Sequence, residues 1–244
     1  GCMTDRALKQ RIREGEIITS ISVPMEIEAG QFADLIGQHQ CDYVSVDAQH
    51  GPFNEALLVS FCAMADELEI PVQIRIKHTR HAYLIGNYLD LGPSSVMVPE
   101  VEEESVVDEA VNAFYYPQVG KRSWGGTLRV GLNERPERLD YAPWWNNYGW
   151  MSIQIESVQA VINAGKLAKP GVDVFNFGPN DLLFSIEAHP KFPYRTVEDC
   201  VKNVLDQVGD SHVKVGVGFG VDTPEDYERY RNLCVTIFGQ RIGI

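Results

Sequence analysis

The sequence predicts a (β/α)8 barrel, in which eight parallel strands form a closed barrel with helices on its outside. Eight short apolar runs alternate with amphipathic segments along almost the whole chain. Most of these runs are continuously apolar, which is typical of parallel strands covered on both faces. The length of 244 residues matches one such barrel, so we expect a single domain over residues 1–244.

The expected strands are short and bounded by turn residues, and they lie at 17–23, 43–47, 72–76, 95–98, 151–155, 172–177, 213–219 and 235–238. The expected helices lie between them, at 27–39, 54–68, 79–91, 103–115, 157–168, 196–209 and 224–233. The last of these begins with Thr223 as N-cap and Pro224 at the first helical position. A doubly wound open sheet is the main alternative, but it usually has fewer strands, and we find no glycine-rich dinucleotide loop.

Two features depart from a regular barrel. The connection from 117 to 150 is long, aromatic and rich in turn residues, which is typical of segments that carry function or bind a partner. The sequence stops at Ile244, just after the eighth strand, so we expect the eighth helix to be missing from this chain. An uncovered barrel flank together with the apolar Trp144 and Trp145 predicts a homo-oligomer, with these tryptophans at the interface or in a pocket wall. The alternative is a monomer in which both tryptophans pack inside their own loop.

The composition argues against several partners. The formal net charge is −13, from 21 basic and 34 acidic residues, so phosphate backbones and anionic membrane surfaces would repel the chain. The sequence contains no run of 18 apolar residues that would span a membrane. The five cysteines are odd in number and form no Cys-x-x-Cys pair, which favours a reducing cytoplasm. We therefore expect no nucleic-acid partner, no membrane partner and a cytoplasmic location.

Polar residues follow the C-terminal ends of several expected strands, and in a barrel these ends form one mouth. Strand 43–47 ends at Asp47, with His50 three residues on, and strand 72–76 contains Arg75. An Asp47–His50 pair would act as an oriented base, in which the carboxylate fixes the imidazole tautomer. The alternative is that Asp47 caps a turn beside an incidental His50.

Two carboxylates occupy corresponding positions on later strands. Glu156 follows strand 151–155, which also contains Gln154, and Asp181 follows strand 172–177. Two carboxylates completed by water and a chelating substrate suit a hard divalent cation such as Mg²⁺ or Mn²⁺. Taken singly, Glu156 also fits a helix N-terminal carboxylate and Asp181 fits a helix cap. Their joint position at strand ends favours a metal site.

Five segments resemble, in order and spacing, the motifs of the HpcH/HpaI aldolase family of metal-dependent pyruvate aldolases. They are Val46-Asp47-Ala48-Gln49-His50-Gly51-Pro52, Pro71-Val72-Gln73-Ile74-Arg75, Tyr116-Pro117-Gln118-Val119-Gly120-Lys121-Arg122, Gln154-Ile155-Glu156 and Gly178-Pro179-Asn180-Asp181-Leu182. The resemblance covers roughly residues 7–240. It implies a class II aldolase that cleaves a 4-hydroxy-2-oxo acid to pyruvate, or a close analogue, and an aldehyde.

The resemblance also implies a role for each site residue. Glu156 and Asp181 would bind Mg²⁺, Mn²⁺ or Co²⁺, which chelates the small 2-oxo acid. Arg75 would neutralise the enolate oxygen, and His50, oriented by Asp47, would handle the hydroxyl proton. Three further contacts to substrate are implied, namely the side chain of Gln154 and the backbone N–H groups of Asn180 and Asp181. Family members are commonly hexamers, which agrees with the expected homo-oligomer.

The chain departs from the family pattern at three positions. Gln49 stands where an acidic residue usually precedes the histidine, and Leu183 replaces a common serine. The segment Ser123-Trp124-Gly125-Gly126-Thr127 differs from the Gly-rich stretch followed by a serine that is usual after the arginine of the Tyr-Pro motif. These departures put the substrate in doubt more than the reaction class. Three alternatives therefore stay open: another carbon–carbon lyase or condensing enzyme of the same barrel superfamily, a barrel that binds a 2-oxo acid without turnover, and a Schiff-base mechanism on Lys77.

Overall fold

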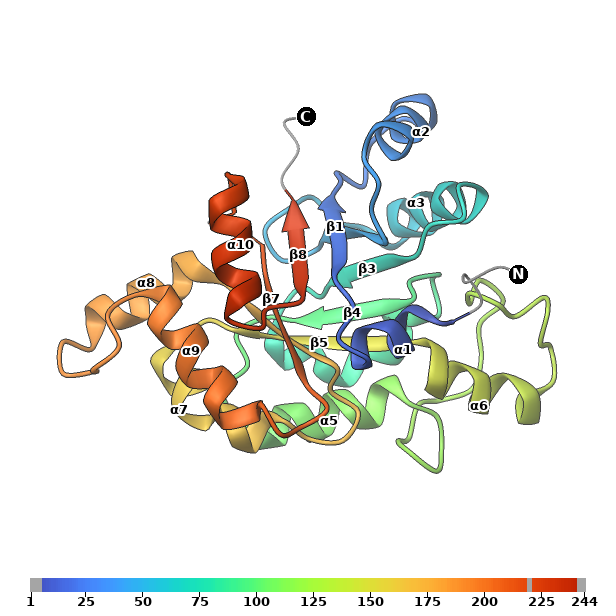
Figure 1. The fold of residues 1–244 in the computed structure, drawn as a ribbon. Coiled ribbons are helices and arrows are strands. Elements are labelled where there is room, and N and C mark those ends of the chain that lie inside the picture. Colours follow the sequence, from blue (N-terminus) through green and yellow to red (C-terminus); the bar gives the residue numbers. More distant parts are fainter. Residues whose placement is uncertain (1–5, 219–220, 241–244) are drawn as a thin grey trace.

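Eight parallel strands close into a barrel in the computed structural model, which describes residues 6–218 and 221–240 (Figure 1). Each strand pairs with its neighbours in sequence, and β8 pairs with β1. The strands are β1 Ile18–Ser22, β2 Tyr43–Asp47, β3 Val72–Arg75, β4 Ser95–Val98, β5 Trp150–Ile155, β6 Val174–Phe177, β7 Lys214–Val217 and β8 Ile237–Gln240. The prediction of a (β/α)8 barrel is confirmed.

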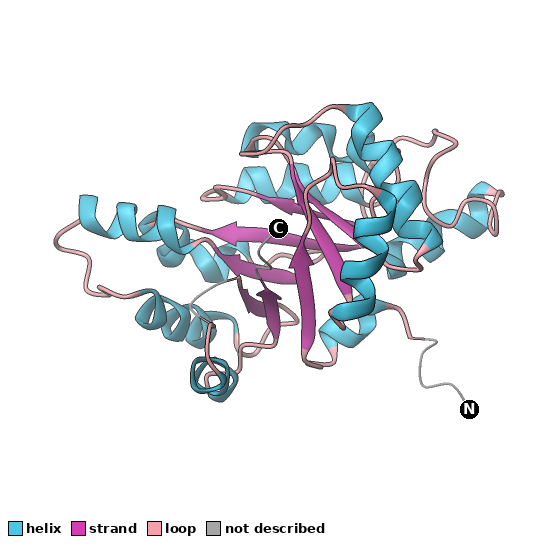
Figure 2. Ribbon diagram, turned by 90° about the horizontal axis from the view of Figure 1, so that it is seen from above, coloured by secondary structure: helices cyan, strands magenta, loops and turns pink. Residues whose placement is uncertain are grey.

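Helices surround the strands on the outside of the barrel, as Figure 2 shows from above. They are α1 Leu8–Arg13, α2 Ala29–Gln38, α3 Glu55–Glu67, the 3-10 helix η1 Thr79–Leu84, α4 Ile85–Leu89, α5 Glu104–Phe114, α6 Arg138–Tyr148, α7 Val158–Leu167, α8 Pro179–Ala188, α9 Val197–Val208 and α10 Pro224–Asn232. All seven expected helical segments contain helix, and Thr223 caps α10 by accepting the N–H of Asp226. The sequence reading missed α1, α6 and α8.

Two strands begin two residues later than expected, each after a residue with a positive φ. Gly171 has a φ of 98°, and β6 starts at Val174 rather than at 172. Cys234 has a φ of 75°, and β8 starts at Ile237 rather than at 235. The last residue of the expected strand 213–219 is Phe219, which lies outside the described residues. The expected absence of an eighth helix concerns residues after β8, which lie outside them as well.

The long connection from 117 to 150 is partly helical, because α6 forms despite Pro143 in its interior. Trp145 is only 1% exposed, and its indole N–H donates to the carbonyl of Phe114 at 2.9 Å. Trp144 is half-buried and stacks on Tyr148, with ring centroids 4.4 Å apart. The expectation that both tryptophans form an interface or pocket wall is therefore wrong for Trp145, which packs against Phe114 of α5 in the main hydrophobic core.

A buried ion pair holds α1 against the N-terminal end of the barrel. The Lys9 ammonium, which is 4% exposed, donates to Asp173 at 2.8 Å and to the Tyr115 hydroxyl at 2.7 Å. Arg13 donates to the other oxygen of Asp173 at 2.9 Å. Beside this network, Leu8 and Ile12 of α1 pack into a separate apolar cluster with residues from the bottom of the barrel. The end of the barrel opposite the strand-end residues is thus closed.

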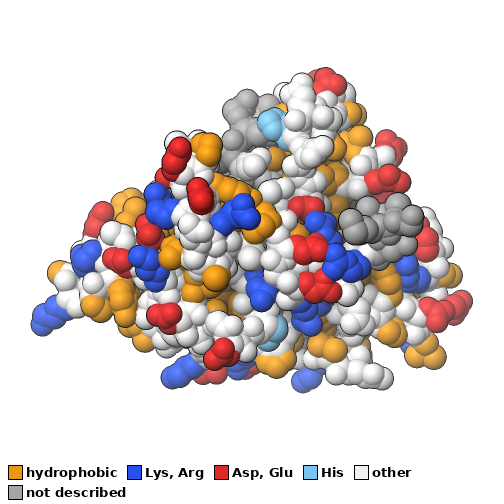
Figure 3. Space-filling view, viewed as in Figure 1, with side chains coloured by type: hydrophobic (Ala, Val, Ile, Leu, Met, Phe, Trp, Pro, Cys, Tyr) orange, Lys and Arg blue, Asp and Glu red, His pale blue; other side chains and the backbone are white. Residues whose placement is uncertain are grey.

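The outer surface carries mixed charge. On the face drawn in Figure 3, acidic, basic and apolar side chains are interspersed rather than gathered into a basic stripe. Among the described residues, no helix has both the length and the apolar character needed to cross a membrane. The four cysteines within the described ranges, Cys41, Cys62, Cys200 and Cys234, carry free thiols.

Candidate active site at the barrel mouth

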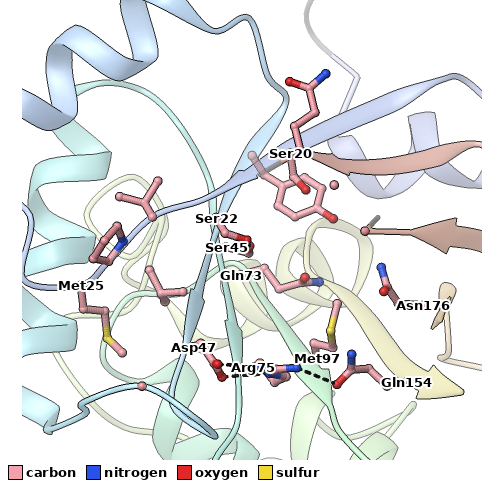
Figure 4. Close-up of a pocket in the computed structure, with 18 of the residues that line it drawn as sticks. Ser20, Ser22, Met25, Ser45, Asp47, Gln73, Arg75, Met97, Gln154 and Asn176 are labelled. Atoms are coloured by element: carbon pink, nitrogen blue, oxygen red, sulfur yellow. Dashed lines mark hydrogen bonds and ion pairs between the residues drawn. The ribbon is translucent and has the colours of Figure 1, made fainter. Parts of the chain in front are cut away.

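The structure brings Asp47, Arg75 and Gln154 together at the C-terminal mouth of the barrel (Figure 4). Asp47 and Arg75 are paired in register as the last residues of β2 and β3. Gln154 points into the barrel from β5 and is 5% exposed. Side chains alternate between the two faces of a strand, so these inward positions face one another across the opening.

Asp47 holds the Arg75 guanidinium in a two-pronged ion pair. Nε of Arg75 donates to Oδ1 of Asp47 at 2.9 Å, and Nη2 donates to Oδ2 at 2.6 Å. Nη1 donates to the Gln154 amide oxygen at 3.4 Å. Since a guanidinium has five N–H donors, one N–H on each Nη is left for an oxyanion. Burial acts to raise the pKa of Asp47, but the hydrogen bonds and charge of Arg75 outweigh it and keep this pKa below its ordinary value.

In the structure Asp47 pairs with Arg75 rather than with the ring of His50, the partner that the sequence predicts. Both carboxylate oxygens of Asp47 are engaged by Arg75, and Oδ1 also accepts the backbone N–H of Gln49 at 2.9 Å. A charged, bidentate guanidinium competes more strongly for a carboxylate than a neutral imidazole does. His50 is exposed on the loop after β2, and its role in proton transfer stays a prediction.

Glu156 lies immediately after β5 and is 6% exposed, an unusual degree of burial for a carboxylate. Burial raises its pKa to about 7, and the Asp181 carboxylate also raises it. The backbone N–H of Glu100 and the Arg75 charge act in the opposite direction. The charges of Glu156 and Asp181 also act to raise the pKa of Arg75.

These two carboxylates fit a divalent cation as donors. Two neighbouring carboxylates, one of them buried, repel each other unless a cation or a proton lies between them. Among residues 6–218 and 221–240, no group of three or more His, Cys, Asp or Glu side chains is arranged to hold a metal ion. Within the described part of the chain, Glu156 and Asp181 are the carboxylates we assign to such a site, and a hard cation bound there would need substrate and water oxygens to complete its coordination.

Gly178 and helix α8 shape this side of the mouth. A Cβ on Gly178 would overlap Oε1 of Glu156, so only glycine leaves room for the carboxylate in this position. Gly178 is also the N-cap of α8, whose first turn contains Pro179, Asn180 and Asp181. The first N–H groups of a helix have no intrahelical partners, so those of Asn180 and Asp181 are available to an anion.

A cavity of about 510 Å³ opens beside Arg75 and extends down into the barrel. Figure 4 shows Ser20, Ser45, Gln73 and Asn176 around it, drawn above Arg75 in this view. The Gln73 amide donates to the hydroxyls of Ser95 at 2.9 Å and Ser152 at 3.1 Å, which makes a polar layer inside the barrel. Glu156 and Asp181 lie outside the cavity lining, as does the exposed Lys77.

Glu100 is a site residue that the sequence reading missed. It follows β4, and its backbone N–H donates to Oε2 of Glu156 at 2.7 Å. Its side chain accepts a long hydrogen bond from Gln49 at 3.5 Å. Catalytic groups in a barrel sit at the C-terminal ends of the strands, and this rule also predicts Glu100 when it is applied to β4.

The other two departures from the expected motifs, Gly126 and Leu183, lie outside the lining of the cavity beside Arg75. Gly126 has a φ of 85°, and its carbonyl accepts a hydrogen bond from Arg129 at 2.7 Å. An added Cβ there would approach Asp90. Leu183 is 38% exposed on α8.

Comparison with known proteins identifies the family. The family model described as HpcH/HpaI aldolase/citrate lyase matches residues 28–213, about three quarters of the chain. The chain belongs to the HpcH/HpaI family. Both the resemblance noted from the motifs and the prediction of a carbon–carbon lyase are confirmed at this level.

Curated relatives and solved structures agree with this assignment. A hydroxypyruvate/pyruvate aldolase of Roseobacter denitrificans is 26% identical over 212 residues, which cover 86% of this chain and 80% of that protein. A 2-keto-3-deoxy-L-rhamnonate aldolase of Salmonella gallinarum is 28% identical over 204 residues, covering 80% and 74%. An HpcH/HpaI aldolase from Desulfitobacterium hafniense superposes with a TM-score of 0.80 at 21% identity, covering 97% of this chain and 90% of that one.

The first prediction concerns Gly178. Substitution Gly178→Ala should displace the Glu156 carboxylate and weaken binding of Mn²⁺ by about 10- to 100-fold, the usual cost of disturbing the support of a metal ligand. Isothermal titration calorimetry measures the affinity. Gly30→Ala is the matched control, because a Cβ there meets nothing within 4 Å. Equal Mn²⁺ affinities for wild type and Gly178→Ala would contradict the proposed packing.

The second prediction concerns Glu156 in metal-free protein. The pKa of Glu156 rises from 4.5 to about 7 on folding, so between these pH values the folded state keeps a proton that the unfolded chain has lost. The protonated carboxyl of Glu156 therefore contributes up to about 3 kcal/mol to the free energy of unfolding. This contribution is complete below pH 4.5 and is lost as pH rises through 7.

Urea unfolding at several pH values, compared between wild type and Glu156→Gln, isolates this effect, since the neutral amide does not titrate. The wild-type free energy of unfolding should fall relative to that of the variant across the same range. Parallel curves for the two proteins would show that burial does not shift this carboxyl.

Proposed function

We propose that this chain is a metal-dependent class II aldolase that cleaves a 4-hydroxy-2-oxo acid to pyruvate, or a close analogue, and an aldehyde. The observation that carries the proposal is the fixed Arg75 guanidinium, which Asp47 and Gln154 hold at the rim of the barrel and whose pKa the charges of Glu156 and Asp181 help to raise. The names of both curated relatives also support it, since each is an aldolase whose name contains a 2-oxo acid.

The chemistry requires two tasks, which are removal of a hydroxyl proton and stabilisation of an enolate. A divalent cation held by Glu156 and Asp181 would act as Lewis acid on the oxo acid. The two remaining N–H groups of Arg75 stabilise the developing oxyanion, and their geometry is set before substrate arrives. The helix N-terminus at Asn180 and Asp181 holds the substrate carboxylate.

His50 is our candidate for the proton at the hydroxyl that becomes the aldehyde. An imidazole ring can both accept and donate a proton through its nitrogens, which suits a group that takes up and returns a proton. Its exposed position on the loop after β2 favours transfer through a water molecule. The cavity beside Arg75 is lined by serine and amide side chains together with Asp47, Glu26 and apolar residues, and it offers space for a small polar substrate.

A condensing reaction is the second candidate function. The citrate synthase SbnG superposes with a TM-score of 0.80 at 21% identity, covering 97% of this chain and 91% of that one. An enolate stabilised by Arg75 would serve condensation as well as cleavage.

In either case we infer a homo-oligomer, a hexamer being one candidate, because Leu183 and Phe184 of α8 are exposed apolar side chains near the mouth.

The third prediction is metal-dependent release of pyruvate. A panel of 4-hydroxy-2-oxo acids with Mg²⁺, Mn²⁺ or Co²⁺, coupled to lactate dehydrogenase, should report turnover that EDTA abolishes. Glu156→Gln and Asp181→Asn should lose most activity, whereas Glu187→Gln, an exposed carboxylate on the same helix as Asp181, should not.

Other outcomes of this assay point to the alternatives. Full activity in EDTA, with inactivation by borohydride and pyruvate, would replace the proposal with a Schiff base on Lys77. Binding of metal and oxo acid without turnover of any compound would indicate a non-catalytic barrel. Condensation without cleavage would favour the second candidate.

The fourth prediction separates Arg75 from His50. His50→Ala should lower aldol cleavage by about 10²- to 10⁴-fold and largely spare decarboxylation of oxaloacetate, which needs only the enolate. Arg75→Lys should lower both reactions, because lysine lacks the planar fork. Asp47→Asn should behave like Arg75→Lys, since Asp47 contacts Arg75. Initial rates of both reactions decide this, and an Asp47→Asn variant that loses cleavage alone would restore the Asp47–His50 pairing.

A further inference from the structure

Glu100 has an unusual backbone conformation for its residue type. It follows Val98 and Pro99 at the end of β4, and its φ is 52°, in the left-handed region that favours glycine. A residue with a side chain persists in this region when its surroundings hold it there, and such residues cluster at functional sites. Its surroundings therefore identify what the conformation achieves.

The backbone of Glu100 faces Glu156. Its N–H donates to Oε2 of Glu156 at 2.7 Å, a short hydrogen bond to a carboxylate that is 6% exposed. The opposite oxygen, Oε1, packs against Gly178. The carboxylate is thus fixed on one side by a donor from the β4 loop and on the other by a glycine before α8.

The side chain of Glu100 faces the loop after β2. Its Oε2 accepts from the Gln49 amide at 3.5 Å, and the backbone N–H of Gln49 donates to Asp47 at 2.9 Å. Asp47 in turn holds Arg75. A continuous series of contacts therefore runs around the mouth from Arg75 through Asp47, Gln49 and Glu100 to Glu156.

We propose that Glu100 is a positioning residue, whose backbone N–H sets the orientation of Glu156 toward a divalent cation and whose side chain, through Gln49, ties the loop that carries His50 to that carboxylate. The inference rests on the proposed function in one respect, namely that Glu156 is a metal ligand. It assigns to Glu100 two separable tasks, one for the backbone and one for the carboxylate.

Two substitutions separate these tasks. Glu100→Gly accepts the left-handed conformation and keeps the N–H, but it removes the carboxylate. Glu100→Val keeps an N–H but disfavours this conformation strongly, because its side chain is β-branched, so the N–H turns away from Glu156. By calorimetry, Mn²⁺ affinity should fall about 10- to 100-fold in Glu100→Val and stay within about threefold of wild type in Glu100→Gly.

The role of the Glu100 carboxylate is tested by measuring turnover. Glu100→Gly should lower kcat for aldol cleavage while Mn²⁺ affinity is kept, since the His50 loop loses its tie. Gln49→Glu should also lower kcat, because two carboxylates then face each other across the 3.5 Å contact. The double variant Gln49→Glu with Glu100→Gln again places one amide opposite one carboxylate. It should therefore recover most of the kcat that Gln49→Glu alone loses.

The outcomes distinguish this inference from the proposed function. Absence of Mn²⁺ binding by the wild type would overturn both. Wild-type binding with unchanged affinity in Glu100→Val would overturn the backbone task alone, and an exchange variant no better than Gln49→Glu would overturn the carboxylate task. Circular dichroism checks folding, and if Glu100→Val does not fold, Glu100→Ala makes the same comparison with less strain.

Discussion

The ion pair between Asp47 and Arg75 is the interaction on which the mouth of the barrel depends. An arginine side chain is long and flexible, and it acts as a preorganised oxyanion donor only when its plane is fixed. Asp47 fixes that plane with both oxygens, and Gln154 adds a third contact from across the barrel. The residual N–H donors are therefore aimed by the strands themselves, and no loop has to close to place them.

Much of this arrangement follows from one property of parallel barrels, which is that all strands end at the same rim. The sequence supports the placement of Asp47, Arg75, Gln154, Glu156 and Asp181 at that rim because each follows or ends an apolar run. The strand bounds differ from expectation mainly where positive φ values at Gly171 and Cys234 precede a strand, and backbone angles of this kind leave little trace in hydrophobic patterning.

The pairing of side chains could not be read from spacing along the chain. Asp47 lies three residues from His50 and 28 from Arg75, yet it binds Arg75, because neighbouring strands place their last residues side by side. The contact of Glu100 with Glu156 spans 56 positions for a similar reason. Helix α6 was missed because Pro143 and the surrounding tryptophans resemble a loop, whereas burial of Tyr141 and Trp145 stabilises the helix. Tertiary contacts of this kind override local propensity.

The Lys9–Asp173 network lies at the closed end of the barrel, opposite the candidate active site. A charge pair that is almost fully buried is costly to disturb, and here it joins α1, the start of β5 and the segment before β6, far from the rim. Stability and chemistry are thus carried by opposite ends of the same strands. Residues at the rim can diversify in evolution, acquiring new acceptors or new reactions, without touching the contacts that keep the barrel closed.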